Sequence, residues 1–101
     1  MDAEDVWTLA LGLPQAEEAP HFHFTSFRVR GKIFATVPPE RTHVHVFVDP
    51  ARIDAAVAED PAAVAELWWG KQRCGVRVDL AAARREHVEA LLAEAWRRKA
   101  P

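Results

Sequence analysis

Polar and hydrophobic residues alternate between Pro20 and Val48 in a pattern that predicts consecutive β-strands. Phe27 and Val29 alternate with Arg28 and Arg30, and side chains two residues apart in a strand share a face. The pattern continues with one aliphatic set, Ile33, Ala35, Val37, Val44, Val46 and Val48, which alternates with a second set, Lys32, Phe34, Thr36, His43, His45 and Phe47. One face of the predicted sheet therefore suits a core, whereas the other is cationic and aromatic.

Helices are predicted before and after these strands. Apolar residues at helical spacing predict helices over residues 3–11, 50–58 and 80–99. Asp49-Pro50 and Asp60-Pro61 are both typical helix starts, and the second predicts a short helix over 61–67 followed by a loop over 68–72. Strands are expected at 19–24, 27–30, 32–37, 42–48 and 73–79. Short connections favour an α+β fold, in which helices pack on one face of an antiparallel meander of four or five strands.

Length and composition indicate one domain over residues 1–101, of which 50% are hydrophobic. No apolar run approaches the roughly 20 residues of a membrane-spanning helix, and the acidic start does not resemble a signal peptide. We expect a monomeric cytoplasmic protein. The single cysteine, Cys74, excludes an internal disulfide, and its position in phase with valines predicts a buried, unreactive thiol.

Charge is distributed unevenly along the chain. The net charge of −2 argues against strong, unspecific binding of nucleic acid. Residues 20–48, however, carry four basic side chains against one acid, and residues 67–78 carry three and no acid, whereas residues 1–19 carry five acids and no base. Separate layers of strands and helices would make the molecule electrically two-sided.

The sequence contains few features that indicate a catalytic site. Ser26 has no Gly-x-Ser-x-Gly context, the glycines form no phosphate-binding loop, and Glu17 and Glu18 face opposite ways in a strand. Four histidines form two His-x-His pairs that a divalent metal could bridge, although polar positions on adjoining strands explain them equally well: His21, His23, His43 and His45. We expect no enzymatic activity, no cofactor and no metal.

A cationic and aromatic set is the stronger candidate for a binding surface. Basic side chains meet phosphates, and exposed aromatic rings stack on bases or on the apolar groups of a partner. A solvated strand face with arginines paired to nearby acids, and Phe34 packed on Phe47, is the alternative. A basic cluster at 97–99 either touches phosphate or complements a helix C-terminus. The predicted nucleic-acid-binding residues are Arg28, Arg30, Lys32, Phe34, Phe47, Trp69, Lys71, Arg73 and Arg77.

Several blocks of the chain stand out in combination. They are Leu13-Pro14 with Glu17 and Glu18, Phe27-Arg28-Val29-Arg30-Gly31-Lys32-Ile33-Phe34-Ala35, Val48-Asp49-Pro50, Trp69-Gly70-Lys71-Gln72 before Gly75-Val76-Arg77-Val78, and Ala95-Trp96. Together they resemble the MmcQ/YjbR family of small bacterial proteins, commonly labelled DNA-binding. The resemblance implies an α+β fold with a double-wing arrangement and a DNA-binding role. Cys74 stands where the family pattern has an aromatic residue, so the open face is expected to differ there.

These observations lead to one expectation and one alternative. The chain is expected to be a non-enzymatic binding domain that holds DNA or another nucleic acid on the basic and aromatic sheet face. The alternative is a module that uses the same cationic face for an acidic protein or a small-molecule ligand.

Overall fold

Three helices and six strands make up the computed structural model, which describes residues 1–100. The strands form one sheet in the order β1-β2-β3-β4-β6-β5, and every neighbouring pair is antiparallel. The elements are α1 (Ala3–Leu11), β1 (Ala16–His21), β2 (Phe24–Val29), β3 (Lys32–Val37), β4 (His43–Val46), α2 (Pro50–Glu59), β5 (Val64–Trp69), β6 (Gln72–Asp79) and α3 (Arg85–Lys99). The predicted α+β fold is confirmed, with six strands where four or five were expected.

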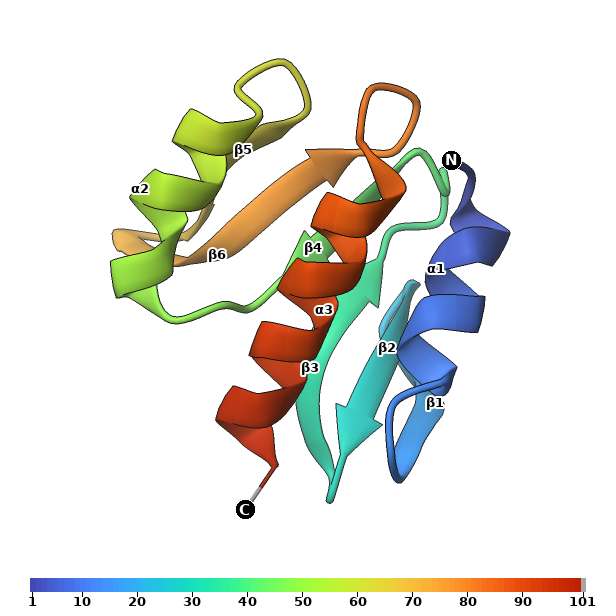
Figure 1. Ribbon diagram of the computed structural model, residues 1–101. Helices are drawn as coiled ribbons and strands as arrows, with labels where there is room; N and C mark the ends of the chain where they lie inside the picture. The colour runs from blue at the N-terminus through green and yellow to red at the C-terminus, as the bar shows by residue number, and fades with distance from the viewer. Residues whose placement is uncertain (101) are drawn as a thin grey trace.

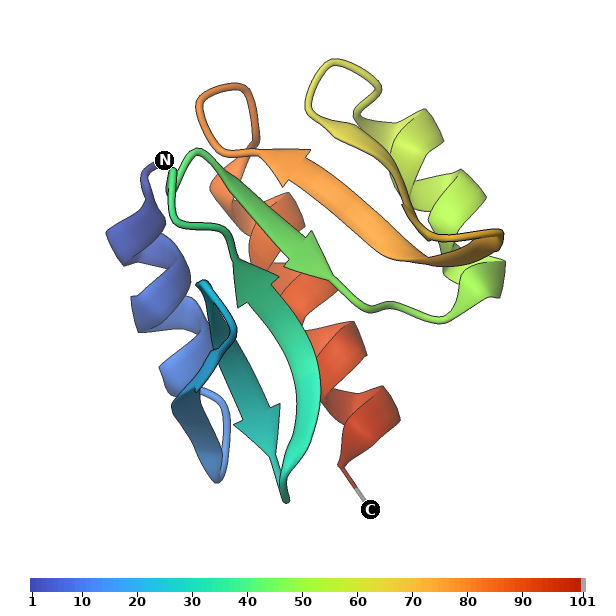
Figure 2. The same ribbon diagram turned by 180° about the vertical axis from the view of Figure 1, so that it is seen from behind.

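The helices lie on one side of the sheet (Figure 1). Helix α1 contacts β1 and β4, α3 contacts β3 and β4, and α2 contacts β5 and β6. The core between the two layers contains Val6, Phe27, Val46, Ile53 and Leu91, all fully buried. Seen from behind, the opposite face of the sheet is not covered by any of these helices (Figure 2). None of the described helices is long and apolar enough to cross a membrane.

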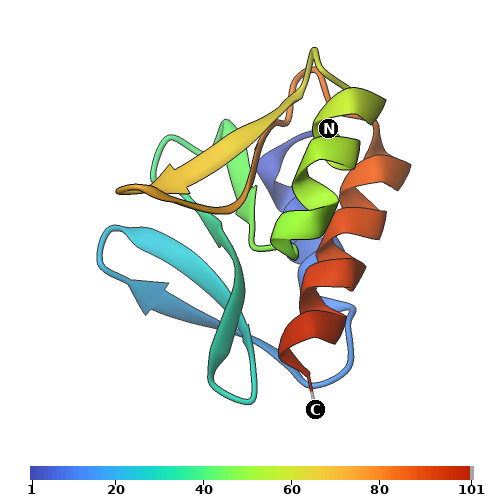
Figure 3. The same cartoon turned by 90° about the vertical axis from the view of Figure 1, so that its left-hand side faces the viewer.

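Two hairpins project from the sheet on the side away from the helices (Figure 3). We call the β1–β2 hairpin wing one and the β5–β6 hairpin wing two. Strands β3 and β4 run between them in the order of the sheet. The double-wing arrangement that the family resemblance implied is therefore present.

Local signals place the first two helices correctly. Asp2 and Asp5 form a reciprocal capping box at the start of α1, in which each carboxylate accepts a hydrogen bond from the other residue's backbone N–H. Asp49 accepts a hydrogen bond from the Ala51 N–H at the start of α2. The last helix begins at Arg85 rather than at residue 80, because the segment before it forms turns.

The helix predicted over 61–67 is wrong, because that segment enters β5. Asp60 and Pro61 start only a turn, in which the N–H groups of Ala63 and Val64 donate to the Asp60 carbonyl. The chain then extends and pairs with β6 from Val64 onward. The predicted loop over 68–72 shortens accordingly to a tight turn at Gly70, whose φ of 60° suits glycine. Pairing with β6 therefore overrides an alanine-rich sequence with high helix propensity.

A β-bulge in β3 corrects the predicted orientation of three residues. Phe27 lies opposite Ala35 and Arg28 opposite Ile33, so Phe34 is an extra residue on β3. The bulge reverses the alternation: Phe34 turns into the core, where it is fully buried, and Ile33 turns to the uncovered face. Lys32, a predicted binding residue, lies opposite the core residue Val29 and therefore turns to the helix side. The prediction that Phe34 belongs to the binding surface is therefore wrong.

Candidate functional site

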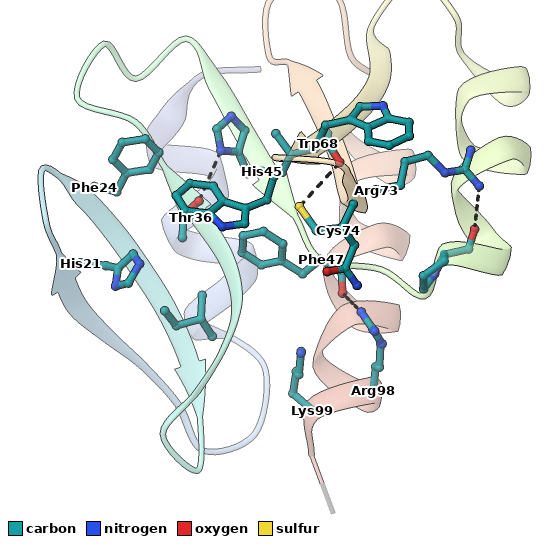
Figure 4. Close-up of a pocket in the computed structure, with 15 residues that line it drawn as sticks. His21, Phe24, Thr36, His45, Phe47, Trp68, Arg73, Cys74, Arg98 and Lys99 are labelled. Atoms are coloured by element: carbon teal, nitrogen blue, oxygen red, sulfur yellow. Dashed lines mark hydrogen bonds between the residues drawn. The ribbon is translucent and has the colours of Figure 1, made fainter.

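A cleft of about 650 Å³ lies on the uncovered face of the sheet, between the two wings (Figure 4). We call it the wing cleft. Wing one contributes His21 and Phe24, and the central strands and the segment after β4 contribute Ile33, Thr36, His45, Phe47 and Pro50. Wing two contributes Leu67, Trp68, Trp69, Gln72, Arg73 and Cys74, and the end of α3 contributes Arg98 and Lys99.

Aromatic rings from three parts of the chain face this cleft. Phe24 lies against the His45 imidazole, with ring centroids 5.9 Å apart. Phe47 is half-buried, and its backbone N–H donates to the Phe34 carbonyl at 3.0 Å. Trp69 is 82% exposed although it lines the cleft. Because so much of the indole is exposed, little of it packs against the protein, and its flat face is available for stacking.

His45 is a neutral polar group on the same surface. Burial, and then the charges of Arg77 and His43, lower the pKa of His45 to about 4. At neutral pH its ring therefore carries no charge and both offers and accepts a hydrogen bond. Thr36 Oγ1 lies 3.5 Å from Nδ1, at the limit of a hydrogen bond.

The histidine pairs do not assemble into a metal centre in the described part of the chain. No group of three or more His, Cys, Asp or Glu side chains there is arranged to hold a metal ion. His21 lines the wing cleft, whereas His23 lines a separate hollow beside Trp7.

Most of the predicted cationic residues are exposed, and two are held by other groups. Arg30, Lys32, Lys71 and Arg77 have exposed side chains, and Arg77 lies opposite His45 in the β4–β6 pairing. Arg28 is half-buried on wing one. Its Nε donates to Ser26 Oγ at 2.9 Å and its Nη2 to the Pro20 carbonyl at 3.2 Å, which leaves its charge without a carboxylate partner.

Arg73 behaves differently from the prediction. Leu67 lies opposite Gly75 and Trp68 opposite Arg73, so Cys74 is the extra residue of a second bulge and the alternation reverses there. The Arg73 guanidinium consequently turns to the helix side, where it pairs with Asp54 at 2.6 Å and Glu66 at 3.4 Å. It reaches only the edge of the wing cleft, and its charge is already neutralised.

The electrostatic character of the cleft follows from this arrangement. Among residues 1–100, no aspartate or glutamate lines the wing cleft. Asp54 and Glu66 are held by Arg73, and Glu59 and Glu94 by Arg52, so these acids lie among the helices and at the edge of wing two. Because these acids lie away from its lining, the wing cleft suits an anion.

Comparison with known proteins identifies the family to which this fold belongs. The family model described as YjbR matches residues 11–98. The chain belongs to the YjbR family. The crystal structure of Deinococcus radiodurans protein DR2400, described as a DUF419 domain, is similar to this YjbR domain with a TM-score of 0.79 and 19% identity. The match covers 94% of this chain and 75% of that one, and at this identity it supports the fold alone. The comparison with curated proteins found no match.

Several residues that line the cleft of this YjbR domain were not predicted from sequence. Arg98 and Lys99 reach it from the last turn of α3 (Figure 4). Arg98 Nη1 donates to the carbonyls of Phe47 and Val48 at 3.0 and 3.1 Å. Their basic cluster is visible in the sequence, but the sequence does not show that α3 ends beside the segment that follows β4.

Cys74 also differs from its prediction in this YjbR domain. The bulge takes it out of phase with the valines, so it is half-buried and lines the wing cleft. Its thiol lies 3.6 Å from the Leu67 carbonyl oxygen, and burial raises the pKa of the Cys74 thiol. The thiol is therefore mostly protonated at neutral pH, but it is not buried as the sequence predicted.

Proposed function

We propose that this YjbR-family protein binds single-stranded nucleic acid, with unpaired bases in the wing cleft and phosphates along its cationic rim. The observation that carries the proposal is a cleft that combines exposed aromatic rings with cations and contains no carboxylate among the described residues. The family resemblance to proteins labelled DNA-binding supports it independently of the geometry.

The shape of the cleft favours single strands over duplexes. A volume of about 650 Å³ lies within the range of roughly 300–1,000 Å³ typical of sites for small ligands. It accommodates one or two bases and not a duplex. Stacking on Trp69 or Phe47 also requires a free base face, which a paired and stacked base does not offer. Each stacked base is worth about 1–3 kcal/mol, with little dependence on sequence.

The charges set the strength of binding. Arg77 and Lys71 are exposed, and Arg98 bonds only to carbonyls, so about three phosphates can be neutralised beside the cleft. With a slope of about −0.7 per phosphate for single strands, affinity is expected to fall roughly 20-fold between 50 and 200 mM salt. The net charge of −2 keeps this binding modest, because the helix layer repels the strand at long range.

Fluorescence anisotropy of a labelled 12-nucleotide oligothymidine, with a duplex of equal length beside it, tests the proposal. We expect the single strand to bind more tightly than the duplex, and both Trp69→Ala and Arg77→Gln to weaken it. Arg84→Gln is the matched control, because Arg84 is exposed at the start of α3 and does not line the cleft. Absence of binding to either probe at 50 mM salt would refute the proposal.

A small-molecule site is the second candidate, favoured by the same cleft volume. In that case a ring that carries an anionic group fills the cleft alone, and extension into a longer strand adds nothing. A thymidine monophosphate that binds as tightly as the 12-nucleotide strand would favour this alternative. A steady gain in affinity with strand length would favour nucleic acid.

A further inference from the structure

Two cations, Arg98 and Lys99, lie at one end of the wing cleft, beside Phe47. Arg98 and Lys99 line the cleft from the end of α3, and Figure 4 shows both side chains below the Phe47 ring. Lys32 does not line the cleft: it is exposed at the start of β3, opposite the core residue Val29, and therefore lies on the helix side of a strand that packs against α3. Burial, followed by the positive charges of Arg98 and Lys32, lowers the pKa of Lys99, because both charges disfavour the protonated ammonium.

No carboxylate compensates these charges in the part of the chain that the structure describes. The ion pairs within residues 1–100 do not include Lys32, Arg98 or Lys99. Arg98 uses Nη1 for two neutral carbonyls of the segment after β4, which leaves Nε and Nη2 for a second partner. Lys99 is half-buried, and no carboxylate of residues 1–100 pairs with it. Grouping like charges in this way costs stability, which an anionic ligand would recover.

The remaining cleft offers no equivalent position for an anion. Arg73 is the other basic residue that lines it, and its guanidinium is engaged by Asp54. Aromatic and aliphatic side chains line most of the surface between this edge and Arg98. A ligand that places rings on the aromatic surface must therefore put its principal negative charge at the end formed by Arg98 and Lys99.

We infer that this end is a subsite for a terminal phosphate, so that the cleft prefers a phosphorylated end of a single strand to an internal stretch. The inference rests on the proposed function. A phosphomonoester carries about −1.5 to −2 charges at pH 7 and three acceptor oxygens, whereas an internal diester carries one charge. Two cations, one of them the Arg98 guanidinium with a free edge, match the monoester better, because a guanidinium binds phosphate through two parallel hydrogen bonds.

Competition against a labelled strand tests the inference. The competitors are six-nucleotide oligothymidines with hydroxyl ends, with a 5′-phosphate or with a 3′-phosphate, which also assigns the preferred end. We expect at least one phosphorylated form to compete about tenfold better than the hydroxyl form, the effect of one hydrogen-bonded charged group. Lys99→Gln should remove that preference. Arg97→Gln, one residue from Arg98 but outside the cleft, should keep it.

Two outcomes separate failure of this inference from failure of the proposed function. Equal competition by all three strands would overturn the terminal-phosphate subsite while leaving nucleic-acid binding in place. If no strand binds, the proposed function fails, and phenyl phosphate becomes the probe. Its binding is read from protection of Cys74, the single thiol of the chain, against a maleimide. Protection that disappears in Lys99→Gln supports the subsite, and absence of protection overturns it.

Discussion

Truncation of two phenylalanines gives a sharp test of the bulge in β3. The alternation in the sequence places Phe34 and Phe47 on one face, whereas the structure buries Phe34 completely in the core and leaves Phe47 half-buried in the wing cleft. The two alanine variants should therefore separate folding from binding. Phe34→Ala should destabilise the protein strongly, and Phe47→Ala should mainly impair binding.

The magnitudes follow from burial. Removal of a fully buried phenylalanine side chain costs about 3–5 kcal/mol, a large share of the roughly 5–15 kcal/mol that stabilises a whole domain. At roughly 4 °C or more per kcal/mol for a domain of this size, Phe34→Ala should lower Tm by about 12 °C or more. The half-buried Phe47 side chain has less apolar surface removed from water, so Phe47→Ala should cost about 1–2 kcal/mol of stability. Loss of its stacking surface should weaken strand binding by about 1–3 kcal/mol.

Thermal melting followed by circular dichroism measures the first quantity, and oligothymidine anisotropy below both melting temperatures measures the second. The Phe34→Ala protein that remains folded should bind with near wild-type affinity, because its missing ring lies behind the sheet. Equal losses of stability in the two variants would refute the assigned orientation. An unchanged affinity of Phe47→Ala would remove this ring from the proposed binding surface.

Three further predictions concern strand contact, protonation and charge. A Cβ at Gly75 would overlap the Val46 carbonyl oxygen, so Gly75→Ala should cost about 1–3 kcal/mol, and an unchanged Tm would contradict this close approach. Because burial holds the pKa of His45 at about 4, whereas the unfolded chain protonates near 6.5, stability falls as pH drops from 7 to 4. Partial exposure of the ring reduces this loss of stability to about 1–2 kcal/mol. Urea unfolding of wild type and His45→Gln at each pH measures it, and identical pH profiles of the two proteins would contradict the prediction. Arg73→Gln should leave strand affinity within about twofold, whereas Arg77→Gln should weaken binding and reduce the salt slope by about 0.7. A larger loss of affinity in Arg73→Gln than in Arg77→Gln would show that Arg73 faces the ligand.

Features that depend on a few neighbouring residues were predictable from the sequence. Asp2 and Asp49 cap helices that begin where expected, because capping is a contact within one turn. The valines of β4 and the Phe27–Val29 pair face the core as their alternation indicated. Arg30 and Lys32 are exposed because they flank the tight turn between β2 and β3, which the sequence marks with Gly31.

Features set by a distant partner were not predictable. Residues 62–67 have a sequence that suits a helix, and only the pairing of β5 with β6 makes them a strand. The position of Arg98 beside Phe47 joins residues 51 apart in the chain, and no local pattern indicates that contact. Ion pairing of Arg73 with Asp54 likewise depends on how α2 packs against wing two.

The two bulges connect the prediction errors to the formation of the site. Phe34 and Arg73, two of the predicted binding residues that turn to the helix side, lie at the bulge in β3 and directly beside the bulge at Cys74 in β6. These two strands flank β4 in the sheet. A bulge bends its strand and increases the local twist, so one on each side of β4 favours the outward bend of both wings from the central strands. Regular alternation would keep all the predicted residues on one flatter face, with less of a cleft between the wings. The irregularities that moved these side chains therefore help to form the concave surface on which Trp69, Phe47 and the end of α3 meet.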